Sequence, residues 1–325
     1  MNSVRCISLV AILAVLLAFC GCGSSASHKV TEFDLPDKDG STHELTLGPD
    51  GNVWVTQQTQ EKLVRITPRG AQRSFALPPG SGPHGIRFDS HGRLWITLEF
   101  ANAIAQIDGT GQIVKPPYPI PSRGAGPHGL DIARDGAVWW TGKEGDVIGR
   151  LDPSTGKMRV FHLPRHGRTP SKPIYIAQGC DAMYFTELTG SRIGRITNSG
   201  RITEYPTPTP NAMPIAVAPH RCQIWFSEAN GNHFGVLDPR TRHITEYPLP
   251  RPDEKLAGLA FDRSGRLWLQ YVQPDLIGLV GAGMKVREFP IPTKDATMHR
   301  IILGPGGNMW FTEFASDKVG YIKTQ

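Results

Sequence analysis

One phrase recurs seven times along the chain, and it restricts the fold more than any other feature. It consists of a glycine-containing turn, an apolar residue, an aromatic residue, an apolar residue and usually threonine, as at residues 51–56 and 92–97. The aromatic positions are Trp54, Trp95, Trp139, Tyr184, Trp225, Trp268 and Trp310. They are separated by 41, 44, 45, 41, 43 and 42 residues. A regular period of this length indicates a repeat architecture.

Three further phrases recur in each unit and predict its strands. A phrase like Pro-His-Gly-Ile (residues 83–86) begins the unit, one like Ile-Gly-Arg-Ile (193–196) follows the aromatic, and one like Ile-Thr-Glu-Tyr-Pro (202–206) comes last. Four short strands in about 42 residues match one blade of a β-propeller. No apolar stripe of period 3.6 supports a helical repeat. We therefore predict an all-β fold, a seven-bladed β-propeller of four-stranded blades, in a single domain over residues 29–325.

The two ends of the predicted domain complement each other. The last unit stops at Gln325, directly after its third strand, and lacks an outer strand. Residues 30–36 (VTEFDLP) form an outer-strand phrase with no blade before it. Pairing these segments would bury two open sheet edges. The pattern predicts ring closure by the N-terminal strand and a monomeric protein.

The first 22 residues resemble a targeting segment. Residues 7–19 are apolar apart from Ser8, and Arg5 is the only charge before them. This run has the length of a signal-peptide core and is short for a membrane span. Cys22 follows Gly21 and precedes a Gly/Ser stretch, which predicts lipidation at Cys22, a linker over 23–28 and a membrane contact only through the lipid anchor. The alternative is ordinary cleavage and release, and both predict an exported protein.

The net charge of +6 comes from scattered basic residues and forms no stripe. A scattered excess favours solubility or weak attraction to acidic surfaces. It argues against nucleic-acid binding, which needs clustered Lys and Arg.

One position in the first strand of each unit carries histidine in four units of seven. In chain order it is His43, His84, His128, Ile174, Ile215, Ala257 and His299. Equivalent positions in a propeller lie on a circle around the axis, so we expect the four imidazoles to meet at one central mouth. Imidazole acts as base, acid or metal ligand near neutral pH. The alternative is that these rings only bond to the backbone of a neighbouring blade.

A second position, three residues after each aromatic, is also polar. It reads Gln57, Leu98, Gly142, Glu187, Glu228, Tyr271 and Glu313. Some of these carboxylates are expected to bond only to turns. Glu313 shares its unit with His299, so we expect it beside any chemistry at the mouth.

Two cysteines of the predicted mature chain occupy similar places in adjacent units. Cys180 and Cys222 both fall in the turn between the first and second strands, in the two units whose spacing is 10 residues where the others have 11. An exported protein meets an oxidising compartment, where a disulfide persists. The alternative is two free thiols, because a bridge requires Cα atoms within about 7 Å.

From about Lys29 to Gln325, the phrases Gly-Pro-His-Gly-Ile, Asn-Met-Trp-Phe-Thr-Glu and Ile-Thr-Glu-Tyr-Pro-Leu-Pro resemble the virginiamycin B lyase (streptogramin B lyase) family. The resemblance implies a Mg²⁺-dependent lyase that opens a cyclic depsipeptide antibiotic at its ester bond by elimination. It implies His299 as the base that removes an α-proton and Glu313 as a metal ligand. From their axial positions we expect His43, His84 and His128 to bind substrate at the same mouth.

The chain departs from the family pattern at two positions. Ala257 stands where the family has another essential histidine, and Thr297 stands where it has a glutamate. Three hypotheses therefore stay open. The first is a metal-assisted lyase. The second is a non-catalytic exported propeller that binds a ligand or partner protein at its central face. The third is a lactone hydrolase of the six-bladed propeller group, which seven aromatic positions disfavour.

Overall fold

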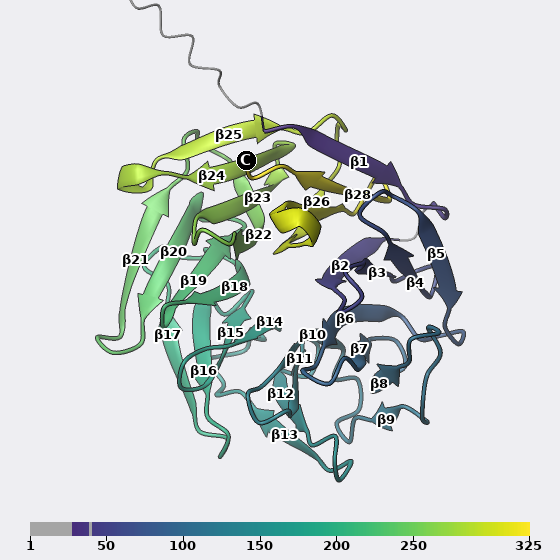
Figure 1. Cartoon of the computed structure of the whole chain (residues 1–325). Coiled ribbons are helices and arrows are strands. Elements are labelled where there is room, and N and C mark those ends of the chain that lie inside the picture. The colour runs from purple at the N-terminus through teal and green to yellow at the C-terminus, as the bar shows by residue number, and fades with distance from the viewer. Residues whose placement is uncertain (1–27, 39–40) are drawn as a thin grey trace, which may run out of the picture.

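The protein is a ring of seven four-stranded antiparallel sheets around a central axis, described by a computed structural model (Figure 1). The structure describes residues 28–38 and 41–325. The predicted signal peptide, the lipidation site Cys22 and nearly all of the predicted linker lie outside these residues. Within the described part of the chain, none of the helical segments has the length and apolarity needed to cross a membrane.

Six blades are consecutive runs of four strands, and the seventh combines three C-terminal strands with the N-terminal strand. In each blade the innermost strand lies nearest the axis (Figure 1). Blades 1 and 2 comprise β2 Thr42–Leu47, β3 Val53–Gln57, β4 Lys62–Ile66, β5 Gln72–Ala76, β6 Pro83–Phe88, β7 Leu94–Leu98, β8 Ala103–Ile107 and β9 Tyr118–Pro119. Blades 3 and 4 comprise β10 Pro127–Ile132, β11 Val138–Gly142, β12 Val147–Leu151, β13 Met158–His162, β14 Pro173–Gln178, β15 Met183–Glu187, β16 Arg192–Ile196 and β17 Ile202–Pro206.

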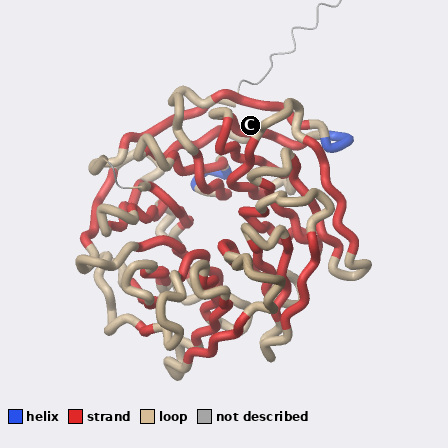
Figure 2. The backbone as a smooth tube through the Cα atoms, turned by 180° about the vertical axis from the view of Figure 1, so that it is seen from behind, coloured by secondary structure: helices blue, strands red, loops and turns tan. Residues whose placement is uncertain are grey.

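Blades 5 and 6 comprise β18 Pro214–His220, β19 Gln223–Glu228, β20 His233–Asp238, β21 His243–Pro248, β22 Lys255–Phe261, β23 Leu267–Gln273, β24 Leu276–Val280 and β25 Val286–Pro290. Blade 7 comprises β26 Met298–Leu303, β27 Met309–Glu313, β28 Lys318–Ile322 and β1 Val30–Asp34. Two short 3₁₀ segments, Ala282–Met284 and Pro305–Gly307, are the helical parts of the described chain (Figure 2). Seven blades confirm the predicted fold and exclude the six-bladed alternative.

The N-terminal strand closes the ring, as predicted. β1 pairs antiparallel with β28 from Val30 opposite Ile322 to Asp34 opposite Lys318, as the outermost strand of the last blade in Figure 1. Phe33 stacks on Trp310 at a centroid distance of 5.9 Å, and Leu35 is buried beside it. The edge of the seventh sheet is therefore covered by residues from the other end of the chain.

Two of the repeated aromatic residues, Trp95 and Trp268, anchor their blades through the indole N–H as well as the ring. The Trp95 indole N–H donates to Asp89 at 3.0 Å, and that of Trp268 donates to Asp262 at 2.9 Å. Both aspartates also accept backbone N–H groups of the turn that precedes the aromatic strand. In each turn a glycine with positive φ, such as Gly92 at 76°, adopts a conformation that L side chains disfavour. Each aspartate thus links the turn to the buried tryptophan that follows it.

The structure joins Cys180 and Cys222 in a disulfide with a Cα separation of 5.1 Å. The bridge links the first turns of blades 4 and 5 across 42 residues of sequence.

Candidate functional site

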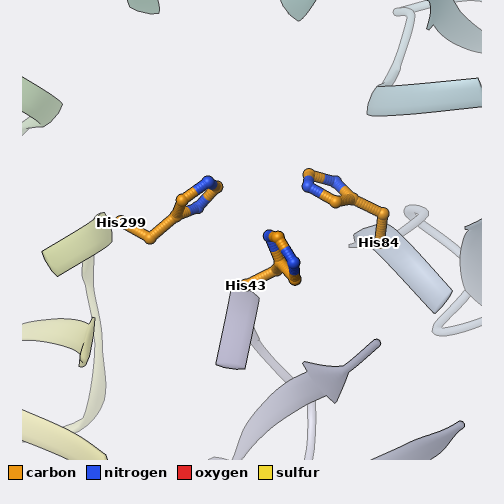
Figure 3. Close-up of side chains that lie close together, drawn as sticks. All are labelled: His43, His84 and His299. Carbon is orange, nitrogen blue, oxygen red and sulfur yellow. The ribbon is translucent and has the colours of Figure 1, made fainter. Parts of the chain in front are cut away.

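Four imidazoles meet at the axis. His43, His84, His128 and His299 come from β2, β6, β10 and β26. The ring centroids of His43 and His84 are 4.4 Å apart, those of His84 and His128 are 3.6 Å apart, and those of His43 and His299 are 4.9 Å apart. Figure 3 shows His43, His84 and His299 pointing toward one another from three separate strands. The first strand of each of these blades therefore delivers a histidine to one mouth.

A β-bulge in the first strand directs each histidine toward the axis. The pairing register shifts between Thr42 and Leu45, and the same shift occurs around the other three histidines. A bulge interrupts the strict alternation of side chains and re-aims one of them. Glycine follows His84 because a Cβ at Gly85 would lie 2.4 Å from the carbonyl oxygen of His128.

The threonine of the repeated phrase holds the histidine backbone of the next blade. Thr56 donates its hydroxyl to the carbonyl oxygen of His84 at 2.9 Å, and Thr97 donates to that of His128 at 2.8 Å. Thr312 closes the circle by donating to the carbonyl oxygen of His43 at 2.9 Å. The repeated phrase thus positions the backbone of His43, His84 and His128, whereas the blade before His299 has Gln270 at this position, and its amide donates to the carbonyl oxygen of Thr312 at 3.0 Å.

Burial keeps the imidazoles uncharged near neutral pH. Desolvation lowers the pKa of His43, His84 and His128 well below the usual value, and Lys143 and the neighbouring imidazoles lower it further. Desolvation also lowers the pKa of His299, although the nearby Glu44 carboxylate partly opposes this. Unprotonated rings are the forms that act as bases and metal ligands.

A second group of polar side chains surrounds the imidazoles and was missed from the sequence. These residues directly follow the axial position in three blades: Glu44, Tyr175 and Arg300. The Tyr175 hydroxyl lies 3.2 Å from His299 Nδ1, and the Arg300 guanidinium lies 4.9 Å above the Tyr175 ring. Glu44 Oε2 lies 3.5 Å from Arg300 Nε and 3.6 Å from an Arg87 guanidinium nitrogen. The other four blades have glycine or alanine at this position, and that contrast was the available signal.

A third group of side chains lies at the position four residues after the blade aromatic, one residue beyond the position of Glu313. Its members are Gln58, Glu99, Lys143 and Phe314. Glu99 Oε1 accepts from Lys143 Nζ at 2.8 Å, and its Oε2 accepts from the Gln58 amide at 2.8 Å. The Phe314 ring packs edge-on against His43 at 4.9 Å. Our prediction from the sequence used the position three residues after each aromatic. Considering the next position as well would have identified these four residues.

Glu313 makes its contacts in a different place. Its Oε2 accepts from the Ser316 hydroxyl at 2.7 Å. Burial, aided by the Glu32 carboxylate, raises the pKa of Glu313 to about 7 against the lowering effects of Ser316, Thr293 and Lys318. These neighbours belong to the seam between β1 and blade 7. The predicted role of Glu313 as a metal ligand stays a prediction.

Three sets of side chains in the described residues have donor atoms close enough to hold a metal ion. They are His43 with His84 and His299, His84 with Glu99 and His128, and Glu228 with His233 and Glu246. Within each set the donor atoms lie within 4.8 Å of one another. The first two sets share His84 and lie at the central mouth, whereas the third lies within blade 5.

Comparison with known proteins agrees with this geometry. The model of the virginiamycin B lyase family matches residues 22–255 and 169–325. The chain belongs to the virginiamycin B lyase family. It is 25% identical over 227 residues to virginiamycin B lyase of Nocardia farcinica, a match that spans 68% of this chain and 75% of that protein.

Two solved structures of the Staphylococcus aureus virginiamycin B lyase resemble it closely. One is 31% identical with a TM-score of 0.83, covering 91% of this chain and 99% of that one. The other is a catalytically inactive histidine-to-alanine variant crystallised with quinupristin. It is 30% identical with a TM-score of 0.84, and covers 91% of this chain and 99% of that one. The chain therefore belongs to the family of a carbon–oxygen lyase, and its central mouth contains four imidazoles.

Proposed function

We propose that this protein is a metal-assisted carbon–oxygen lyase that opens the ester bond of a cyclic depsipeptide by elimination at the central mouth. The observation that carries the proposal is the convergence of four neutral imidazoles on the axis of a virginiamycin B lyase family member. A scaffold needs no such cluster of desolvated bases, because each buried, unpaired imidazole nitrogen costs free energy. We propose substrates of the streptogramin B class, represented by quinupristin.

His299 is the proposed base. Burial and the contact with Glu44 keep Tyr175 protonated, since both raise its pKa well above the usual value. A tyrosine that donates its proton toward Glu44 accepts the N–H of His299 Nδ1, 3.2 Å away. This tautomer leaves Nε2 as the free base. Nε2 would take the α-proton, the C–H electron pair would form the Cα–Cβ double bond, and the ester carboxylate would leave from Cβ.

His84, Glu99 and His128 are the residues that would hold a divalent cation beside this base. Both nitrogens of His84 are buried without a hydrogen-bond partner in the described chain, which fits a ligand role. Mg²⁺ commonly takes one or two protein carboxylates and completes its shell with water and substrate oxygens, and Glu99 supplies one carboxylate. A cation bound there would polarise a substrate carbonyl and stabilise the charge that develops as the proton leaves.

A non-catalytic binding role at the same face is the second candidate. It is favoured by Ala257 and Thr297, which replace the histidine and glutamate of the family pattern. With Ile174 and Ile215, Ala257 makes one side of the axial circle apolar. Such a surface suits an apolar ligand without any reaction.

The two candidates are separated by comparing binding with turnover. Quinupristin should quench the tryptophan fluorescence of both wild type and His299→Ala when it binds. The rate of ring opening should be lower by roughly a hundredfold or more in the variant. The control is His162→Ala, on the outer strand β13. Equal turnover in wild type and His299→Ala would remove His299 from its role. Binding by both without turnover in wild type would establish the non-catalytic candidate.

We also propose that the mature protein is an exported monomer attached to a membrane through a lipid on Cys22. The sequence pattern around Cys22 supports the anchor, and ring closure, which covers the edge of β28 with β1 of the same chain, supports the monomer. Metabolic labelling with palmitate should mark wild type but not Cys22→Ser. Light scattering should give the mass of one chain, and a dimer mass would refute the monomer.

A further inference from the structure

Three blades carry the same pair of carboxylates, one on the second strand and one on the outer strand. The pairs are Glu187 with Glu204, Glu228 with Glu246, and Glu313 with Glu32. In each case the residue that begins the third strand stands opposite or beside the first carboxylate. Two buried carboxylates so close together need a compensating charge or a shared proton.

Blades 4 and 7 supply that compensation from their own side chains. In blade 4 the Ser171 hydroxyl and the Arg192 guanidinium both lower the pKa of Glu187. In blade 7 Ser316 donates to Glu313 at 2.7 Å, and Lys318 Nζ lies 3.5 Å from the partner carboxylate. Each of these two blades therefore has a serine and a basic side chain near its pair, Arg192 in blade 4 and Lys318 in blade 7.

Blade 5 lacks both. Ala212 stands where blade 4 has Ser171, two residues before the proline of the first strand, and Gly231 stands where blade 7 has Ser316. His233 stands at the position of Arg192 in blade 4 and of Lys318 in blade 7. Glu228 is fully buried, and neither of its carboxylate oxygens receives a hydrogen bond from the described chain. Both Glu187 oxygens in blade 4 also lack a hydrogen-bond partner in the described chain, so the difference in blade 5 is the absence of an arginine or lysine beside the pair.

The geometry of this pair is that of a preformed ligand set. Glu246 is held by Thr209, whose hydroxyl donates at 2.7 Å and whose backbone N–H donates at 3.1 Å. His233 Nδ1 lies 3.8 Å from Glu228 Oε2, and its side chain is 28% exposed, which gives an ion access from solvent. The same nitrogen, Nδ1, also contacts the carbonyl of Gly231. A backbone carbonyl that accepts the Nδ1–H orients the ring and leaves Nε2 unprotonated, so Nε2 is the His233 atom that would bind a metal.

We propose that Glu228, His233 and Glu246 bind a divalent transition-metal ion in blade 5, separate from the central mouth. One imidazole and two carboxylates are ligands that Zn²⁺ accepts, and solvent completes its shell. The ion would take the place that Arg192 and Lys318 fill in the other two blades. The metal-free alternative is a proton shared by the carboxylates, consistent with burial and then Glu246 raising the pKa of Glu228 to about 9.

Zinc binding to the chelator-treated mature protein tests this proposal. Wild type should bind one more equivalent of Zn²⁺ by calorimetry than Glu228→Gln or His233→Arg, because the affinity of this site should fall on the order of a hundredfold or more. His233→Arg copies blade 4, so it should fold. Glu187→Gln, the same change in blade 4, is the matched control and should keep the wild-type stoichiometry.

A second readout is independent of activity. Zn²⁺ should raise the unfolding temperature of wild type and of Glu187→Gln through binding to the native state, and Glu228→Gln should lose the part of the shift that this site supplies. Equal stoichiometry and equal shifts in wild type and Glu228→Gln would overturn the proposal and leave the shared proton. Ring opening at the mouth does not enter either measurement, so the two proposals fail separately.

Discussion

Removing the N-terminal strand should destabilise the whole ring. Deleting residues 28–36 takes away five paired residues of β1, the buried Leu35 and the stacking of Phe33 on Trp310. Leu35 is 2% exposed and packs in the same cluster as Leu45 and Val64. Truncating one such leucine to alanine costs about 2–5 kcal/mol. The deletion should cost more than Leu35→Ala, because it also exposes the edge of β28.

Urea unfolding followed by tryptophan fluorescence measures both changes against the full mature chain. Leu77→Ala is the matched control: Leu77 occupies the equivalent position after β5, is 7% exposed, and belongs to a blade whose strands are consecutive. A peptide of residues 28–38 added to the truncated protein should restore part of the lost stability by pairing with β28. If the truncated chain unfolds at the urea concentration of the full chain, closure by β1 contributes nothing and the reasoning is refuted.

Three more outcomes are expected. Thiol titration of the unfolded, unreduced protein should find neither Cys180 nor Cys222 free, and reduction should cost roughly 4 kcal/mol for a 42-residue loop; two free thiols would contradict this. Burial, then Glu204, raises the pKa of Glu187 to about 8, so its favourable contribution is present below the unfolded pKa near 4.5 and is lost as the pH rises through 8. The advantage of Glu187→Gln in unfolding free energy should therefore grow with pH, and a constant difference would count against the shift. Tyr175→Phe should lower kcat about tenfold with KM and stability unchanged, because only the orientation of His299 is lost; an unchanged kcat would remove Tyr175 as a positioning residue.

The sequence predicts the propeller because the same phrases recur at a regular interval along the chain. Seven aromatic positions predict seven blades, and an outer-strand phrase without a blade predicts closure. The axial histidines are found for the same reason, since one register repeated around a circle places His43, His84 and His299 at one mouth.

The repeat does not predict the other residues around the mouth. A bulge breaks the strand alternation at the axis, so Glu44 and Tyr175, each next to an axial residue, also reach the central cluster. Glu99 lies beyond the end of β7, where strand periodicity no longer says which way a side chain points. Glu313, the last residue of its strand, contacts Ser316 within the seam of blade 7. Single residues at strand ends depend on tertiary contacts that a repeat does not encode.

Mass analysis of quinupristin after incubation with the protein and Mg²⁺ tests the central claim most directly. Elimination moves a proton and breaks the C–O bond without adding any atom, so the opened product should have the mass of the substrate and a changed chromatographic mobility. Hydrolysis would add the mass of one water. We predict an isomeric, linear product with wild type and its absence with His299→Ala. A hydrated product, or no product with wild type, would contradict a lyase acting at the histidine mouth.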